Sequence, residues 1–110
     1  MTIKATYYGA NGWLIELDQS RILIDPWLNG DLTFPPGDWL IKGKLAKEIE
    51  VPNNIDFLLL TQGQPDHAHP QTLEKIDKGI PVIASPAASK VVRKMAFRNI
   101  TTLKPGESFK

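Results

Sequence analysis

The chain contains no cysteine and only two histidines. Without cysteine, neither a disulfide framework nor a thiolate metal site can form. The longest purely apolar run, Phe57–Leu60, is far shorter than the roughly 20 residues that span a bilayer. The first residues also lack the apolar stretch of a signal peptide. We therefore expect a cytoplasmic protein with no membrane partner.

The chain also lacks an excess of either sign of charge, because 13 basic and 12 acidic residues leave a net charge of +1. The densest basic group is Lys90, Arg93, Lys94 and Arg98, which falls on a predicted helix. A solvated helix face explains this group better than a nucleic-acid surface does, so we expect no nucleic-acid partner. The 110 residues, 42% of them hydrophobic, predict one globular domain over residues 1–110.

The first part of the chain predicts an antiparallel meander. β-branched and aromatic residues favour strands at residues 3–8, 13–17 and 21–25. Residues 9–12 contain two glycines, but no helix pattern follows them. A hairpin turn therefore explains them better than a phosphate-binding loop.

A long irregular connection is predicted over residues 29–52. Pro35-Pro36-Gly37 precludes regular structure, and Trp39 with Leu40 and Ile41 forms an apolar patch. Residues 44–49 fit one or two helical turns. This connection is either a substrate-facing loop or a surface insertion whose tryptophans cover a core edge.

The rest of the chain alternates strands and helices. Phe57–Leu60 shows no polar alternation, which is typical of a strand buried on both faces at the centre of a sheet. Helices are predicted at residues 70–78 and, after Ser85-Pro86, through residue 96. Further strands are predicted at residues 80–84 and 99–103, and residues 108–110 begin another. The pattern predicts an α/β fold with a mixed sheet and its helices on one face.

A polar turn at residues 61–70 carries Asp66, His67 and His69 at the carboxyl end of the predicted central strand. α/β proteins usually place their chemistry at such strand ends. We expect His69 to lie on the surface or to cap the following helix. Asp66 has a structural alternative, which is to accept backbone N–H groups at the helix start. Asp25, with Pro26, either ends its strand or lies near this site.

The frame Thr61-Gln62-Gly63-Gln64-Pro65-Asp66-His67 resembles the His-x-His-x-Asp-His motif of the metallo-β-lactamase superfamily. Asp66 and His67 match, whereas Gln62 and Gln64 stand at the positions of two histidines. Gly9-x-x-Gly12-Trp13 and residues 24–28 are most similar to the L-ascorbate-6-phosphate lactonase-like branch. The resemblance implies the N-terminal half of a four-layer αββα sandwich.

The resemblance also implies chemistry. Family members use zinc to generate hydroxide that attacks an ester, amide or phosphodiester. The resemblance implies that Asp66 and His67 belong to a metal site and that Asp66 has a catalytic role. Glutamine offers zinc only a neutral oxygen, so Gln62 and Gln64 predict impaired or absent metal binding, with no cofactor in the isolated chain. The alternative is a non-catalytic α/β module that binds a partner or ligand through the same crevice.

The predicted sheet has more apolar surface than its helices can cover. Trp13, Ile15, Ile22 and Ile24, together with Leu58 and Leu60, are expected to form a second apolar face. We expect this face to join two copies as a homodimer, or else to cause aggregation. Alternatively, the connection at residues 27–39 folds back and covers it, leaving a monomer.

Overall fold

The computed structural model describes residues 2–33, 42–43 and 47–110. The expected Pro35-Pro36-Gly37 break and the apolar patch at residues 39–41 lie outside this range. Residues 47–49, which are described, are not helical, so the expected helix over residues 44–49 is wrong in that part.

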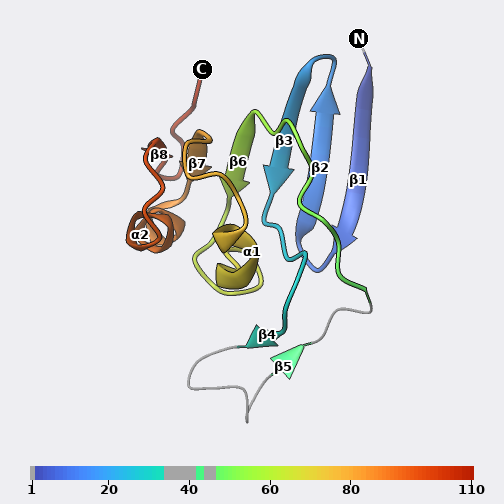
Figure 1. The fold of residues 1–110 in the computed structure, drawn as a ribbon. Helices are drawn as coiled ribbons and strands as arrows, with labels where there is room; N and C mark the ends of the chain where they lie inside the picture. The colour runs from blue at the N-terminus through green and yellow to red at the C-terminus, as the bar shows by residue number, and fades with distance from the viewer. Residues whose placement is uncertain (1, 34–41, 44–46) are drawn as a thin grey trace.

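One six-stranded sheet organises the chain, with the strand order β1-β2-β3-β6-β7-β8 (Figure 1). β4 and β5 form a separate two-stranded ribbon. The elements are β1 (Ile3–Gly9), β2 (Gly12–Leu17), β3 (Ser20–Ile24), β4 (Leu32–Thr33), β5 (Lys42–Gly43), β6 (Phe57–Leu60), α1 (Pro70–Glu74), β7 (Val82–Ala84), α2 (Pro86–Lys94) and β8 (Ile100–Thr102).

The predicted meander is present, since β1, β2 and β3 pair antiparallel in sequence order. Tight turns join these strands, and Ala10 and Asp18 adopt positive φ angles of 50° within them. From β3 onward the pairing becomes parallel, through β6 and β7 to β8. The α/β class and the mixed sheet predicted from the sequence are therefore confirmed, and β6 lies inside the sheet between β3 and β7.

Both helices pack on the same face of the sheet. The core between them and the strands combines leucines of the sheet with apolar side chains of α1 and α2. Val51 and Ile55, from the segment before β6, pack against this core as well. α2 begins at Pro86, where the Ser85 hydroxyl accepts a hydrogen bond from the Ala88 N–H, as Ser85-Pro86 predicted. The buried core residues are Leu23, Leu58, Leu60, Ala68, Leu73, Ile76, Val82, Ala84, Ala88, Val92 and Phe97.

Within residues 2–33, 42–43 and 47–110 no helix lies on the opposite face of the sheet, which we call the open face. Residues directly opposite one another in a ladder point to the same side. The register therefore places three rows on the open face: Tyr7, Trp13, Ile24, Leu59, Ile83 and Thr101; Ala5, Ile15, Ile22 and Phe57; and Ile3, Leu17 and Ser20. None of these side chains is charged, and Ile3, Tyr7 and Trp13 are exposed.

This register corrects two predictions about β6. Leu58 and Leu60 are fully buried against the helices, whereas Phe57 and Leu59 are half-buried on the open face. The strand is therefore not buried on both faces of this chain. The open face of the meander is continued by Phe57 and Leu59 rather than by Leu58 and Leu60. Four consecutive apolar residues give no sign of which pair points toward the helices.

The helix predicted at residues 70–78 is shorter in the structure. α1 ends at Glu74 instead of near Gly79, because the Lys78 ammonium group donates hydrogen bonds to the carbonyls of Leu73, Glu74 and Ile76. These bonds satisfy carbonyl groups that a longer helix would have used.

The expected strand at residues 108–110 is absent. Phe109 instead packs edge-on against Phe57, with 5.7 Å between the ring centroids. No helix in the described part of the chain is long and apolar enough to cross a bilayer.

The register predicts that truncating two neighbouring leucines of β6 changes the free energy of unfolding by different amounts. We expect Leu58→Ala to lower the free energy of unfolding by about 2–5 kcal/mol, because it leaves a cavity in the closed core. Leu59→Ala, on the open face, should have a clearly smaller effect. Urea unfolding at submicromolar protein concentration measures both, and equal losses would contradict the assigned register.

Candidate functional site

Three segments that are distant in sequence meet at the carboxyl ends of β3 and β6. They are the turn between β1 and β2, the residue that follows β3, and the polar loop that follows β6. The parallel register of β3 and β6 brings their ends together, and the Asp25 N–H donates to the Leu59 carbonyl at 3.0 Å. The predicted position of the polar loop at a strand end is therefore correct.

Asp25 is the buried centre of this site. The residue is 3% exposed, and one carboxylate oxygen accepts the Thr61 N–H at 2.8 Å. The other accepts the Thr61 hydroxyl at 2.5 Å and lies 2.8 Å from Nδ1 of His67. Asp25 also has a φ of 43°, a backbone conformation that residues other than glycine rarely adopt. Asp25 therefore does more than end a strand, since it holds the loop that carries His67.

The bond to Asp25 orients the ring of His67. In the tautomer whose Nδ1 carries the proton and donates it to the Asp25 carboxylate, Nε2 on the other side of the ring is unprotonated. Thr61 Oγ1 lies 3.1 Å from the same Nδ1 and limits rotation of the ring. A histidine held in this way by a carboxylate has the orientation that metal-binding histidines usually need.

Asp66 and Asn11 lie on the Nε2 side of His67. Oδ2 of Asp66 is 3.6 Å from His67 Nε2, and the Asn11 amide nitrogen donates to that same carboxylate oxygen at 3.2 Å. The amide also donates to the Asp66 carbonyl at 3.2 Å and lies 3.3 Å from His67 Nε2. Asp66 therefore does not cap the following helix, and that structural alternative is wrong.

The helix cap is supplied by His69, which is only 2% exposed. Its Nδ1 accepts from the Thr72 N–H at 3.4 Å and lies 2.9 Å from the Thr72 hydroxyl. Its Nε2–H donates to the Asp31 carbonyl at 2.8 Å. The expected capping role is confirmed, whereas the expected surface position is wrong. Both ring nitrogens are occupied, so His69 does not face Asp66 and His67 as a further ligand.

Gln62 and Gln64 take no part in this network. Both are exposed, and neither side chain forms a hydrogen bond within the described residues. Gly63 between them lies against α2: a Cβ on it would come within 3.0 Å of the Ala87 carbonyl group. The loop therefore passes close to the helix backbone.

The described residues do not fit a resident zinc ion. They contain no group of three or more histidine, cysteine, aspartate or glutamate side chains placed to hold a metal. Asp66 and His67 come together as predicted, but zinc in proteins usually has three or four protein ligands. One feature favours a bound metal ion: Oδ1 of Asp66 is buried without a hydrogen-bond partner among the described residues.

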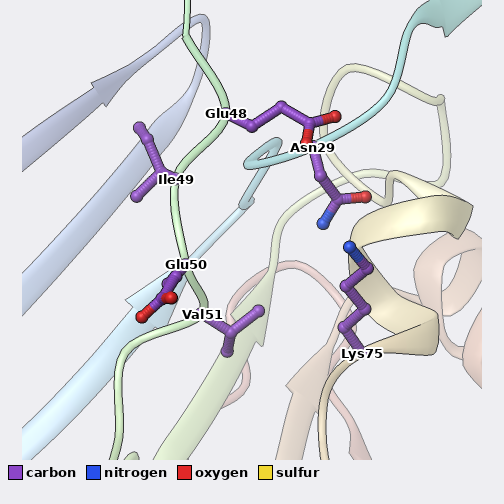
Figure 2. A pocket seen from close by; sticks show the side chains of 6 residues that line it. All are labelled: Asn29, Glu48, Ile49, Glu50, Val51 and Lys75. Atoms are coloured by element: carbon purple, nitrogen blue, oxygen red, sulfur yellow. The ribbon is translucent and has the colours of Figure 1, made fainter.

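A separate cavity of about 280 Å³ lies between α1 and the segment that precedes β6 (Figure 2). Asn29 and Lys75 point toward each other across it, while Glu50 points away. The Glu48 carboxylate accepts the Gly30 N–H at 3.1 Å. This cavity shares no residue with the network around Asp25, so it is not an extension of that site.

Asn11 is the member of the site that sequence reasoning missed. The pattern at residues 9–12 indicates only a turn, and Asn11 lies 55 residues from Asp66 in the chain. Its single local signal is an asparagine in a glycine-flanked turn, a common placement that does not indicate a site.

Burial of His69 predicts a pH dependence of stability. Desolvation lowers the pKa of His69 below its ordinary 6.5, and the bond to the Asp31 carbonyl opposes this only in part. Below pH 6.5 the unfolded chain therefore binds a proton more readily than the folded chain. Neutral, buried His69 therefore contributes fully to the free energy of unfolding above pH 6.5. This contribution is lost as the pH falls from 6.5 through the lowered pKa of His69 in the folded chain.

We expect wild type to lose stability from pH 7 to pH 5 more steeply than His69→Asn, in which asparagine retains the capping acceptor. The difference in slope should stay below the limit of about 1.4 kcal/mol per pH unit for one proton. Urea unfolding at several pH values measures it. Identical slopes for the two proteins would contradict the prediction.

Comparison with known proteins agrees with this architecture. Residues 4–110 match the family model described as a beta-lactamase superfamily domain. A UPF0173 metal-dependent hydrolase of Cereibacter sphaeroides is 28% identical over 81 residues, which cover 74% of this chain and 31% of that protein. A second one, from Paracoccus denitrificans, is 35% identical over 65 residues, covering 59% of this chain and 24% of the relative. The chain thus spans about a third or less of these relatives' length.

Two solved structures share the fold. A possible metal-dependent hydrolase from Veillonella parvula superposes with a TM-score of 0.71 at 18% identity, covering 99% of this chain and 45% of that one. An isothiocyanate hydrolase from Delia radicum gut bacteria gives a TM-score of 0.60 at 16% identity, with coverage of 89% and 40%. The more specific resemblance to L-ascorbate-6-phosphate lactonases stays a prediction. Since the family model covers nearly the whole chain, the protein belongs to the beta-lactamase superfamily.

Proposed function

We propose that this chain is a metallo-β-lactamase-like domain that has the framework of a metal-dependent hydrolase without a resident metal. The observation that carries the proposal is the position of Gln62 and Gln64. Both stand where the family motif has histidines, and both are exposed without side-chain hydrogen bonds among the described residues. A neutral amide contributes little to zinc affinity.

The residues that remain serve a structural role in this proposal. His67 ties the loop after β6 to Asp25, and Thr61 completes the same set of bonds. A buried carboxylate needs such donors, because an unpaired charge inside a protein is strongly destabilising. The motif thus persists as a folded turn, and the assignment of Asp66 to catalysis stays a prediction.

Metal analysis tests this proposal. We expect the chain, purified without added metal, to contain well under 0.1 zinc per molecule and to lack hydrolase activity toward simple esters, since it has two ligands where zinc needs three or four. The double variant Gln62→His/Gln64→His should bind zinc more tightly than wild type, and His67→Ala in that background should reduce the gain. One zinc per wild-type chain would overturn the proposal.

The open face favours a second role as an interaction module, and we propose that a second copy of the chain covers it. The face consists of three register-aligned rows with no charged side chain, and its edge carries the exposed rings of Tyr7 and Trp13. These rings lie 4.8 Å apart, so they present one continuous aromatic surface. An uncharged surface meets a copy of itself without repulsion, as a two-fold interface requires.

The size of the face also favours a second copy. Strand spacing and the two-residue repeat give each position a footprint of roughly 32 Å². The rows then span on the order of 400 Å² in plan, and protruding side chains raise the accessible area above that. The plan area lies within the range of the largest apolar patch of a typical monomer, about 300–600 Å², and such patches are often functional. It is about half of the roughly 800 Å² per partner of a standard interface, so the interface would be a small one.

Light scattering tests the association. At micromolar concentration we expect a mass of twice 12.3 kDa for wild type. Ile22→Lys should give a monomer, because a dimer would bury the new charge at its centre. Gln19→Lys adds the same charge in the exposed β2–β3 turn and should remain dimeric. A wild-type monomer at these concentrations would overturn the association and leave the metal proposal untouched.

A further inference from the structure

We infer that the side-chain amide of Asn11 takes the place of a metal ion between Asp66 and His67. The inference rests on the proposed function, because it explains how a site without resident metal keeps its two remaining ligand side chains together. It goes further by assigning this role to a residue outside the motif. It also predicts that one substitution at this position creates a divalent-cation site.

Three acceptor atoms converge on one nitrogen. Asn11 Nδ2 lies 3.2 Å from Oδ2 of Asp66, 3.2 Å from the Asp66 carbonyl oxygen and 3.3 Å from Nε2 of His67. The first two are oxygens that only accept, and the third is a ring nitrogen that presents a lone pair in the tautomer whose Nδ1 donates to Asp25. Acceptors that converge in this way surround a cation or a hydrogen-bond donor.

The spacing of the two side chains is close to that of two ligands on one metal ion. Ligands about 2.05 Å from a tetrahedral zinc are roughly 3.3 Å apart. His67 Nε2 and Asp66 Oδ2 are 3.6 Å apart. In the tautomer with the proton on Nδ1, the lone pair of Nε2 faces the carboxylate, and a hydrogen-bond donor beside both atoms relieves their repulsion. The amide nitrogen of Asn11, with its two hydrogens, is that donor.

The network also fixes which way the amide points. With the Asn11 oxygen and nitrogen exchanged, a carbonyl oxygen would face the Asp66 carboxylate and the Asp66 carbonyl, and both contacts would be repulsive. The β1–β2 turn holds Asn11 at this spot. The next residue, Gly12, is buried, and a Cβ on it would lie 3.4 Å from the Asp25 carbonyl oxygen. The turn is thus packed against the strand end that positions His67.

Asp66 retains an unused acceptor that a metal would take. Its Oδ1 is buried and has no hydrogen-bond partner among the described residues. Replacing Asn11 with aspartate removes the donor and adds a carboxylate, so that two carboxylates and His67 Nε2 face one point. Three such ligands meet the minimum for a bound zinc or cobalt ion.

The experiment compares wild type, Asn11→Asp and Asn11→Ala by titration with Zn²⁺ and Co²⁺ alone, using calorimetry and visible absorption. We expect Asn11→Asp to bind one ion at least tenfold more tightly than wild type and to develop Co²⁺ ligand-field bands. Its melting temperature should be below that of wild type without metal, because the two carboxylates repel, and should rise when Zn²⁺ is added. Asn11→Ala, which removes the donor without adding a ligand, should show no comparable gain. His67→Ala in the Asn11→Asp background should abolish the binding.

The outcomes separate this inference from the proposal on which it rests. Stoichiometric zinc in wild type overturns both. A metal-free wild type with no gain in affinity for a folded Asn11→Asp overturns the inference alone, as does an equal gain for Asn11→Ala. If Asn11→Asp does not fold, nitrogen-15 NMR of wild type and Asn11→Ala decides. The inference requires the Nε2 resonance of His67 to shift when the Asn11 donor is removed, and an unchanged Nε2 resonance overturns it.

Discussion

The hydrogen bonds of one buried carboxylate hold the two halves of this sheet together at their functional end. Asp25 follows the last antiparallel strand, and Thr61 and His67 follow the first strand of the parallel part. A carboxylate so deeply buried is stable only when donors surround it, so the loop after β6 has to fold onto β3. The positive φ of Asp25 is tolerated because these bonds define its position.

Much of the architecture follows from local patterns in the sequence. Strand-forming residues at the N-terminus predict the meander. Ser85-Pro86 marks the start of α2, because the Ser85 hydroxyl accepts a backbone N–H of the first turn and Pro86 occupies the first helical position. The location of Asp66 and His67 also follows from local signals, since a strand followed by glycine and proline ends in a loop. These features depend on neighbours in sequence, which is why they are predictable.

The features that sequence reasoning missed depend on distant partners. The contact of Asn11 with Asp66 joins a hairpin turn to a loop that forms much later in the chain. The orientation of β6 depends on which leucines the helices cover, and a run of similar side chains does not encode it. The early end of α1 depends on one lysine side chain that returns to the helix carbonyls. Each of these requires a tertiary arrangement that local periodicity does not contain.

The change from antiparallel to parallel pairing at β3 has a consequence for the order of folding. The hairpins of β1, β2 and β3 close short turns, an event that takes about 1–10 μs. Pairing of β3 with β6 joins Arg21 to Asp56, which are 35 residues apart, and must first overcome the entropy of closing that loop. We therefore expect the meander to form early and to offer the edge of β3 as a template, with docking of β6 as the slower step. On this expectation, the length of the connection between β3 and β6 sets the pace at which the site is assembled.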